Sequence, residues 1–214
     1  MLLRTLDDLQ MAFTEAGLPE LFNDMRQHAR NSIVIEVDSE FDTQALGASR
    51  FGGEPDLPPD VEWFTNPTTG APLSFVAQLN FAELKAFDID NQLPVQGILY
   101  FFYDVEAFPW GFDPKDGAGS RVYFYGGQVE QLEKRPSPIE IVQFSSSRLI
   151  FSSQIDLPEY SSWLIDYPLT DDKYERYLDL IDELELEVDH KLLGHSFLCI
   201  KAPIQYRSGA LILR

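Results

Sequence analysis

The apolar positions at the start of the chain have the spacing of an amphipathic helix. Thr5 and Asp8 are placed as a capping box, and Gly17-Leu18-Pro19 forms a stop signal. Between them, the predicted buried face consists of Leu6, Leu9, Phe13 and Ala16. A second short helix is expected over residues 21–29, with Pro19 near its start. Two helices therefore lead into the rest of the chain.

Apolar residues in the middle of the chain follow the pattern of strands instead. The predicted strands cover residues 33–37, 73–79, 98–103, 121–125, 139–144 and 149–155. The strand from Ile98 to Tyr103 is apolar on both faces, which predicts a central position in a sheet. Asn80 and Glu83 have the spacing of a capping box, so a short helix should run through Leu84.

Two further segments complete the predicted fold. Residues 38–72 are rich in glycine and proline but carry interleaved apolar residues, so we expect an ordered loop there. Residues 171–189 have a helical apolar stripe together with nine acidic and two basic residues, and their charged face should contact water. The expected fold class is α+β, a largely antiparallel sheet with two N-terminal helices and one acidic helix near the C-terminus.

The chain is long enough for one large domain. Its 214 residues are 44% hydrophobic, which supplies ample apolar surface for a core. We expect a single domain over residues 1–214. It would comprise a helical lead-in (1–30), a sheet-rich body (31–160), the acidic helix (168–190) and an atypical basic tail (191–214).

The charge and the cysteine content indicate which kinds of partner and which cellular location to expect. The 35 acidic and 16 basic residues give a net charge of -19, which repels the phosphates of nucleic acids and anionic lipids. We therefore expect no nucleic-acid or membrane partner, and a basic protein would be attracted. The single Cys199 excludes an intrachain disulfide, and no signal-length apolar run opens the sequence. These features predict a cytoplasmic location.

The sequence contains no strong catalytic or metal-binding signature. Its histidines are His28, His190 and His195, and the last two are five residues apart, which does not place them on one helical face. We interpret them as helix-cap or surface residues, and we expect no metal and no cofactor. Ser49 lacks the final glycine of a nucleophile elbow. We accordingly assign no catalytic residue.

One enzymatic alternative stays open. Several carboxylates lie close in sequence to Trp63 and Trp110, whose rings could stack on sugars. They are Asp56, Glu62, Asp104, Glu106 and Asp113. A carboxylate-based hydrolase or a carbohydrate-binding protein with tryptophan platforms would need this combination.

The corner around Arg50 is the most informative local feature. Adjacent Gly52 and Gly53 before Pro55 indicate positive φ angles or a close backbone approach. Arg50 is a lone cation beside them and, if buried, must find carboxylate or carbonyl partners, so we expect it to brace the loop. Gln78 lies inside an apolar strand and should hydrogen-bond either to the Gly52-Gly53 backbone or to a ligand.

Ordered motifs along the chain carry a family resemblance. They are Phe51-Gly52-Gly53-x-Pro55-x-Leu57-Pro58, Trp63, Gly70-x-Pro72-Leu73-x-Phe75-x-x-Gln78-Leu79-Asn80, Leu93-Pro94-x-x-Gly97, Trp110-Gly111-Phe112-Asp113-Pro114 and His190-Lys191-Leu192-Leu193-Gly194-His195. On these motifs the chain resembles the YwqG-like family, a bacterial domain of unknown function, over about residues 30 to 195. The resemblance implies an α+β fold, no established enzyme activity and no required cofactor. Some relatives are thought to be companions of toxin systems, which implies an interaction or immunity-type role.

The sequence departs from the family pattern after Gly194. The usual proline, glutamine-containing loop and glycine-aromatic strand pattern are absent, and residues 191–214 contain basic residues but no acidic ones. Such an ending resembles a truncated or frame-shifted terminus. The alternative is a genuine basic hairpin, with Phe197–Ile200 against Ala210–Leu213.

Two functional hypotheses follow from the sequence. The first is a non-enzymatic module that binds a protein through the glycine-rich loop and the aromatic strand ends, with acidity favouring a basic partner. The second is the hydrolase or carbohydrate-binding protein described above. The candidate binding residues are Arg50, Gly52, Gly53, Trp63, Gln78, Asp104 and Trp110.

Overall fold

A computed structural model describes residues 3–41, 45–111, 113–158, 169–185, 190–195 and 212–213. The chain falls into two compact units, each built from separate stretches of sequence. Unit 1 comprises Met1–Glu36, Phe87–Gln92 and Phe151–Arg214, and unit 2 comprises Val37–Ala86 and Leu93–Ile150. Within the described ranges, no helix has the length and apolar character needed to cross a membrane.

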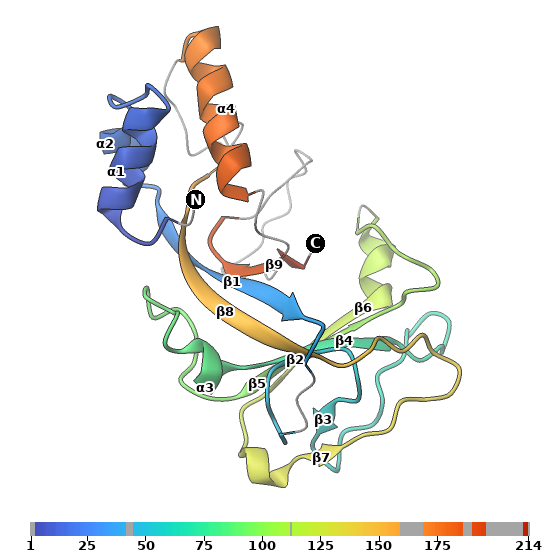
Figure 1. Cartoon of the computed structure of the whole chain (residues 1–214). Coiled ribbons are helices and arrows are strands. Elements are labelled where there is room, and N and C mark those ends of the chain that lie inside the picture. The colour runs from blue at the N-terminus through green and yellow to red at the C-terminus, as the bar shows by residue number, and fades with distance from the viewer. Residues whose placement is uncertain are drawn as a thin grey trace. The chain divides into compact units, whose positions relative to one another are not determined.

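Three helices form the core of unit 1: α1 (Leu6–Glu15), α2 (Phe22–Met25) and α4 (Asp171–Glu185) (Figure 1). The predicted capping box begins α1: Thr5 Oγ1 accepts from the Asp8 N–H at 3.1 Å, and the Asp8 carboxylate accepts from the Thr5 N–H at 2.9 Å. The apolar stripe of α4 packs on α1, with the Phe13 and Tyr177 rings 6.3 Å apart. Residues 186–189 of the predicted acidic helix lie outside the described residues.

The strands of unit 1 follow the order β10 (Ile212–Leu213), β9 (His190–Leu193), β1 (Arg30–Asp38) and β8 (Ser147–Asp156). β9 pairs antiparallel with both β1 and β10. The predicted terminal strand 197–200 lies outside the described residues. The buried residues of β1 are consecutive from Asn31 to Ile35, because this part of the strand is covered on both faces.

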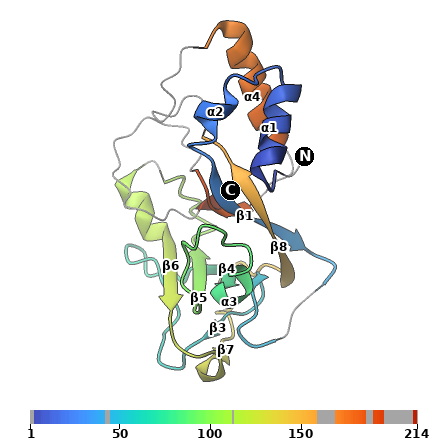
Figure 2. The ribbon, with the colours of Figure 1, turned by 90° about the vertical axis from the view of Figure 1, so that its left-hand side faces the viewer.

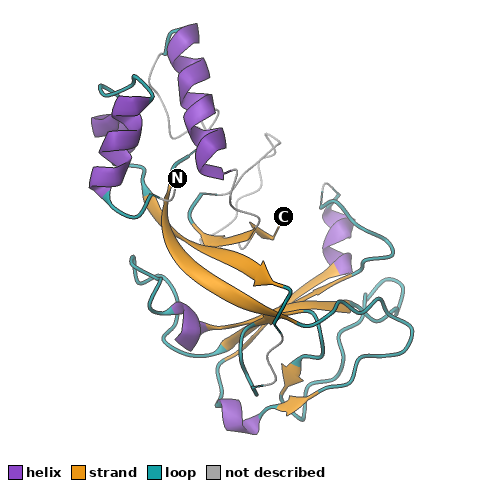
Figure 3. Cartoon of the chain, viewed as in Figure 1, coloured by secondary structure: helices purple, strands orange, loops and turns teal. Residues whose placement is uncertain are grey.

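The sheet of unit 2 contains the first residues of β8, Ser147 to Ile150, followed in order by β2 (Arg50–Phe51), β4 (Ser74–Asn80), β5 (Ile98–Tyr103) and β6 (Ser120–Tyr125) (Figure 2). Its pairings β8–β2, β2–β4, β4–β5 and β5–β6 are antiparallel, which confirms the α+β prediction. A second small sheet joins β3 (Asp56–Leu57) to β7 (Glu133–Lys134). Short helices complete the unit: α3 (Phe81–Leu84), η1 (Pro114–Gly119) and η2 (Val129–Gln131) (Figure 3).

The core of unit 2 lies on one face of β4 and β5. Its buried members are Leu57, Leu73, Phe75, Ile98, Tyr100, Phe102 and Leu132. β5 has the bounds that its uninterrupted apolar run predicts, and it pairs with strands on both sides. The ordered loop predicted over residues 38–72 contributes Leu57, Val61, Trp63 and Phe64 to this core.

The predictions for residues 139–144 and for the start of α3 are wrong. Residues 139–144 form turns and irregular structure, and Ile139 is 95% exposed, so its apolar side chain contributes nothing to a core. At α3, Asn80 accepts from the Ala82 N–H at 3.0 Å as an N-cap should, but Glu83 accepts from the Ser49 N–H at 3.1 Å. A tertiary contact has replaced the reciprocal half of the predicted capping box.

Candidate functional site

The segment from Asp104 to Gly119, here named the aromatic loop, leaves the end of β5 and returns to β6. Backbone bonds close it at its base: the Asp104 N–H donates to the Gly119 carbonyl at 2.8 Å, and the Phe108 N–H donates to the Asp104 carbonyl at 3.0 Å. The Tyr103 hydroxyl donates to the Pro109 carbonyl at 2.6 Å. These bonds fix the first half of the loop against the sheet.

Two aspartates order the second half of the aromatic loop. Asp113 and Asp116 form a capping box at the start of η1. The Asp116 carboxylate also accepts from the Gly111 N–H at 2.9 Å, which ties the residues before η1 to the helix. The described residues of the loop are therefore braced by its own polar groups.

Apolar side chains are nevertheless turned outward on this ordered loop. Phe108 is 56% exposed and has a φ angle of 45°, which is strained for an aromatic residue. Trp110 is 74% exposed and its ring lies edge-on to Phe108, with centroids 5.6 Å apart. Phe108 in turn contacts the ring of Tyr103, with centroids 6.0 Å apart.

The apolar surface continues from the loop onto the sheet. The register pairs Tyr103 with Ser120 and Phe101 with Val122, so Val122 and Phe124 share the sheet face of Tyr103. Val122 is 54% exposed and Phe124 is 45% exposed. We name these five residues the aromatic surface: Tyr103, Phe108, Trp110, Val122 and Phe124.

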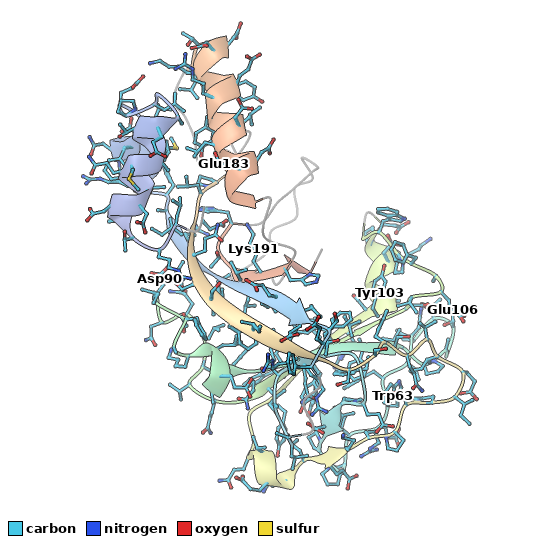
Figure 4. All side chains as sticks on the ribbon, in the orientation of Figure 1. Trp63, Asp90, Tyr103, Glu106, Glu183 and Lys191 are labelled. Atoms are coloured by element: carbon cyan, nitrogen blue, oxygen red, sulfur yellow. The ribbon has the colours of Figure 1, made fainter. Side chains whose placement is uncertain are left out.

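Acidic groups lie near Tyr103 and along the aromatic loop. Figure 4 labels Tyr103 at the end of β5 and Glu106 in the loop that follows. Burial raises the pKa of the Tyr103 hydroxyl, and the charges of Asp104 and Asp116 raise it further. The aromatic loop contains four acidic residues and one basic residue, Lys115, so its field is negative.

A second group of polar residues is buried in unit 2. Arg50 and Asp56 form an ion pair with 1% and 0% of their side chains exposed. Gln78 holds Asp56 from two sides: its Oε1 accepts from the Asp56 N–H at 2.9 Å, and its Nε2 donates to the Asp56 carboxylate at 2.9 Å. The Tyr100 hydroxyl donates to the Asp56 carbonyl at 2.5 Å, and burial followed by the Asp56 charge raises the pKa of Tyr100.

This Arg50-Asp56-Gln78 cluster braces the loop. The predicted bracing role of Arg50 agrees with its contacts, which include the Glu54 and Ala45 carbonyls at 3.4 Å. The expected bond from Gln78 to the Gly52-Gly53 backbone is wrong: its Nε2 donates to the Ala48 carbonyl at 2.8 Å and to Asp56 instead. Full burial keeps these groups from a dissolved ligand.

The glycine corner is structural for a steric reason. Gly52 has a φ angle of 62°, and a Cβ there would lie 2.4 Å from the Ser145 carbonyl oxygen. Gly53 has a φ angle of 72°, and its Cβ would lie 2.8 Å from the Ser146 Cβ. The chain can follow this path only with glycine at both positions.

The remaining predicted site residues lie in different parts of unit 2. Trp63 is half-buried, donates from Nε1 to the Leu73 carbonyl at 2.8 Å and packs edge-on against Phe102, so its ring belongs to the core. Asp104 accepts from Asn66 Nδ2 at 3.0 Å at the base of the aromatic loop that carries Trp110. The structure thus brings Arg50 and Gln78 together in one place and Asp104 and Trp110 in another.

Several residues of the buried Arg50-Asp56-Gln78 cluster and of the aromatic surface could not be predicted from the sequence. It treats Asp56 only as a candidate sugar-binding carboxylate, although a buried Arg50 six residues before it requires a nearby acid. Phe108, Val122 and Phe124 give no usable signal, because exposure of an apolar residue follows from which elements cover it. The four acidic residues of the loop around Trp110 are the one available indication of a negatively charged aromatic loop.

A buried histidine lies in unit 1. The side chain of His195 is 8% exposed, with Nε2 2.6 Å from the His28 carbonyl oxygen. Asp156 accepts from the His195 backbone N–H and from Lys191 Nζ, the latter at 2.8 Å. Burial lowers the pKa of His195, opposed by the His28 carbonyl and the Asp156 charge. His195 is therefore buried, whereas the sequence suggested a helix-cap or surface residue.

Comparison with known proteins gives a family but no activity. No curated protein matches the chain. A family model described as "Domain of unknown function (DUF1963)" matches residues 49–210, which include the glycine corner, the buried cluster and the aromatic loop. That match covers most of the chain, which therefore belongs to the DUF1963 family.

Proposed function

We propose that this protein is a non-enzymatic interaction module that binds another protein through the aromatic surface of unit 2. The observation that carries the proposal is the exposure of Phe108 and Trp110 on a loop that its own hydrogen bonds hold in place. A preorganised loop loses little conformational entropy on binding, and aromatic residues are enriched at protein interfaces.

Charge supports a basic partner. The net charge of -19 and the acids of the aromatic loop attract cations, and the exposed Trp110 ring offers a cation–π contact to an arginine or lysine. The module would act in the cytoplasm. The YwqG-like resemblance adds the proposal that the partner belongs to a toxin system.

The contacts of Trp63, Asp56 and Asp104 favour this role over sugar chemistry. Trp63 is committed to the core, and the Asp56 carboxylate is buried on Arg50. A carboxylate with these partners is not positioned to meet a glycosidic bond. Asp104 is likewise engaged by Asn66.

The test is affinity capture with full-length baits from an extract of the source cells. The wild-type protein is compared with a Phe108→Ser, Trp110→Ser double variant, and Ile139→Ser is the matched control because Ile139 is 95% exposed elsewhere in unit 2. Mass spectrometry should find proteins retained by the wild type and by the control but lost from the double variant. Retention of the same proteins by all three baits would refute the proposal.

A further inference from the structure

β6 is the last strand on its side of the unit 2 sheet. Among the residues that the structure describes, no strand lies beyond it, and it pairs with β5 alone. The outer edge of such a strand presents backbone N–H and C=O groups that can pair with another chain.

The hydrogen-bond register identifies which residues present those groups. The Asp104 N–H donates to the Gly119 carbonyl, directly opposite it in the register that pairs Tyr103 with Ser120. Hydrogen-bonded pairs alternate along an antiparallel ladder, so Arg121, Tyr123 and Tyr125 direct their backbone groups toward β5. The backbone groups of Ser120, Val122 and Phe124 are directed away from β5.

Several features that usually protect an edge are absent from β6 itself. Its sequence, Ser-Arg-Val-Tyr-Phe-Tyr, contains no proline and no lysine, and its register with β5 is unbroken over six pairs. Its single charged residue, Arg121, extends over the Phe64 ring on the opposite face from Val122. The outward-directed residues Val122 and Phe124 are also the half-exposed members of the aromatic surface.

We propose that the partner binds by adding an extended strand to the free edge of β6, with its flanking residues reaching the aromatic loop. This inference rests on the proposed function and specifies how that surface is used. Strand addition obtains affinity from main-chain hydrogen bonds and specificity from alternate side chains.

The charge of the protein indicates which kind of strand would bind to the edge of β6. A second copy of this chain would bring another charge of -19 to the edge. The negative field extends to β6 itself, where burial raises the pKa of Tyr123 and the Asp60 charge raises it further. The strand that fits is therefore a segment of another protein with alternating apolar and basic residues.

The test selects linear random peptides of about twelve residues on the immobilised full chain. The selected peptides should be basic, with alternating apolar residues and no central proline. Val122→Pro removes one outward N–H and should weaken their binding by about tenfold or more. Ile139→Ser is the control, because Ile139 is 95% exposed and lies outside the strands, and it should bind within about twofold of the wild type.

Several results of these experiments would contradict strand addition. Peptides that bind Val122→Pro as well as the wild type, peptides that are acidic, or no selected peptides at all would refute it. A wild-type dimer in sedimentation that Val122→Pro dissociates would assign the edge to a second copy instead. Peptides that tolerate Val122→Pro but are lost on Trp110→Ser would refute strand addition alone and leave the proposed function standing.

Discussion

Single residues in unit 2 fix its conformation through sterics and charge. Gly52 and Gly70 both have positive φ angles, 62° and 73°, but they differ in what a side chain would meet. Gly70 faces open space, whereas Gly52 faces the Ser145 backbone. Comparing substitutions at these two glycines therefore distinguishes the cost of a positive φ angle from the cost of a steric clash.

Gly70→Ala should lower the free energy of unfolding by about 1 kcal/mol, the cost of a left-handed residue with a Cβ. Gly52→Ala should lower it by about 3 kcal/mol, because the backbone near Ser145 must also move. Urea denaturation measures both. Equal losses for the two variants would contradict the steric role of the corner.

The buried ion pair gives a second prediction at this scale. Arg50→Met leaves the Asp56 carboxylate buried without its cation, and the free energy of unfolding should fall by about 3 to 5 kcal/mol. Arg176→Met is the control, because Arg176 pairs with Asp172 at 3.0 Å on the exposed face of α4. That loss should stay below about 1 kcal/mol. Similar losses in denaturant titrations would argue against bracing by Arg50.

His195 should make stability depend on pH. The unfolded residue titrates near its ordinary pKa of about 6.5, while burial lowers the folded pKa. As the pH falls below about 6.5, the unfolded chain binds a proton there before the folded chain does, so stability falls until the folded pKa is passed. Denaturation between about pH 7.5 and about pH 5.5 should show a smaller loss for His195→Gln than for wild type. A slope for His195→Gln equal to that of the wild type would contradict the assignment.

At the scale of elements, the two sides of β6 should differ in their tolerance of proline. The Val122 N–H points away from β5, so Val122→Pro should cost about 1 kcal/mol or less. The Tyr123 N–H points into the ladder, so Tyr123→Pro should cost about 3 kcal/mol or more. Thermal melts compare the two, and equal losses would show that the deduced register is wrong.

The observed helices and strands show which parts of the fold could be predicted from the sequence. The predictions of α1 and β5 are close to the observed elements, because a capping box and an uninterrupted apolar run act locally. The strand predicted over residues 139–144 fails because Ile139 and Val142 stay exposed, although Phe144 packs on Phe51, so the segment has no continuous apolar face to place on a sheet. The Arg50-Asp56-Gln78 cluster joins three separate strands, and the aromatic surface depends on which faces stay uncovered, so neither could be assembled from sequence spacing.

At the scale of the whole molecule, self-repulsion should limit stability. The net charge of -19 opposes compaction, and dissolved salt screens that repulsion. Raising sodium chloride from about 0.02 M to about 0.3 M should therefore raise the melting temperature. Choline chloride should act equally, since screening depends on ionic strength. A rise with sodium alone would indicate specific ion binding instead.

The discontinuous make-up of the two units sets the order in which they can be completed during synthesis. Residues 1–36 leave the ribosome first, but unit 1 also requires Phe151–Arg214, which leave last. All of unit 2 is synthesised in between, so it can fold while α1 still lacks α4. Until then Phe13, which packs on Tyr177 in the finished protein, has no such cover. Through most of its translation the nascent chain therefore carries the apolar side chains of the α1 segment without the cover of α4, and such uncovered apolar residues are what chaperones bind.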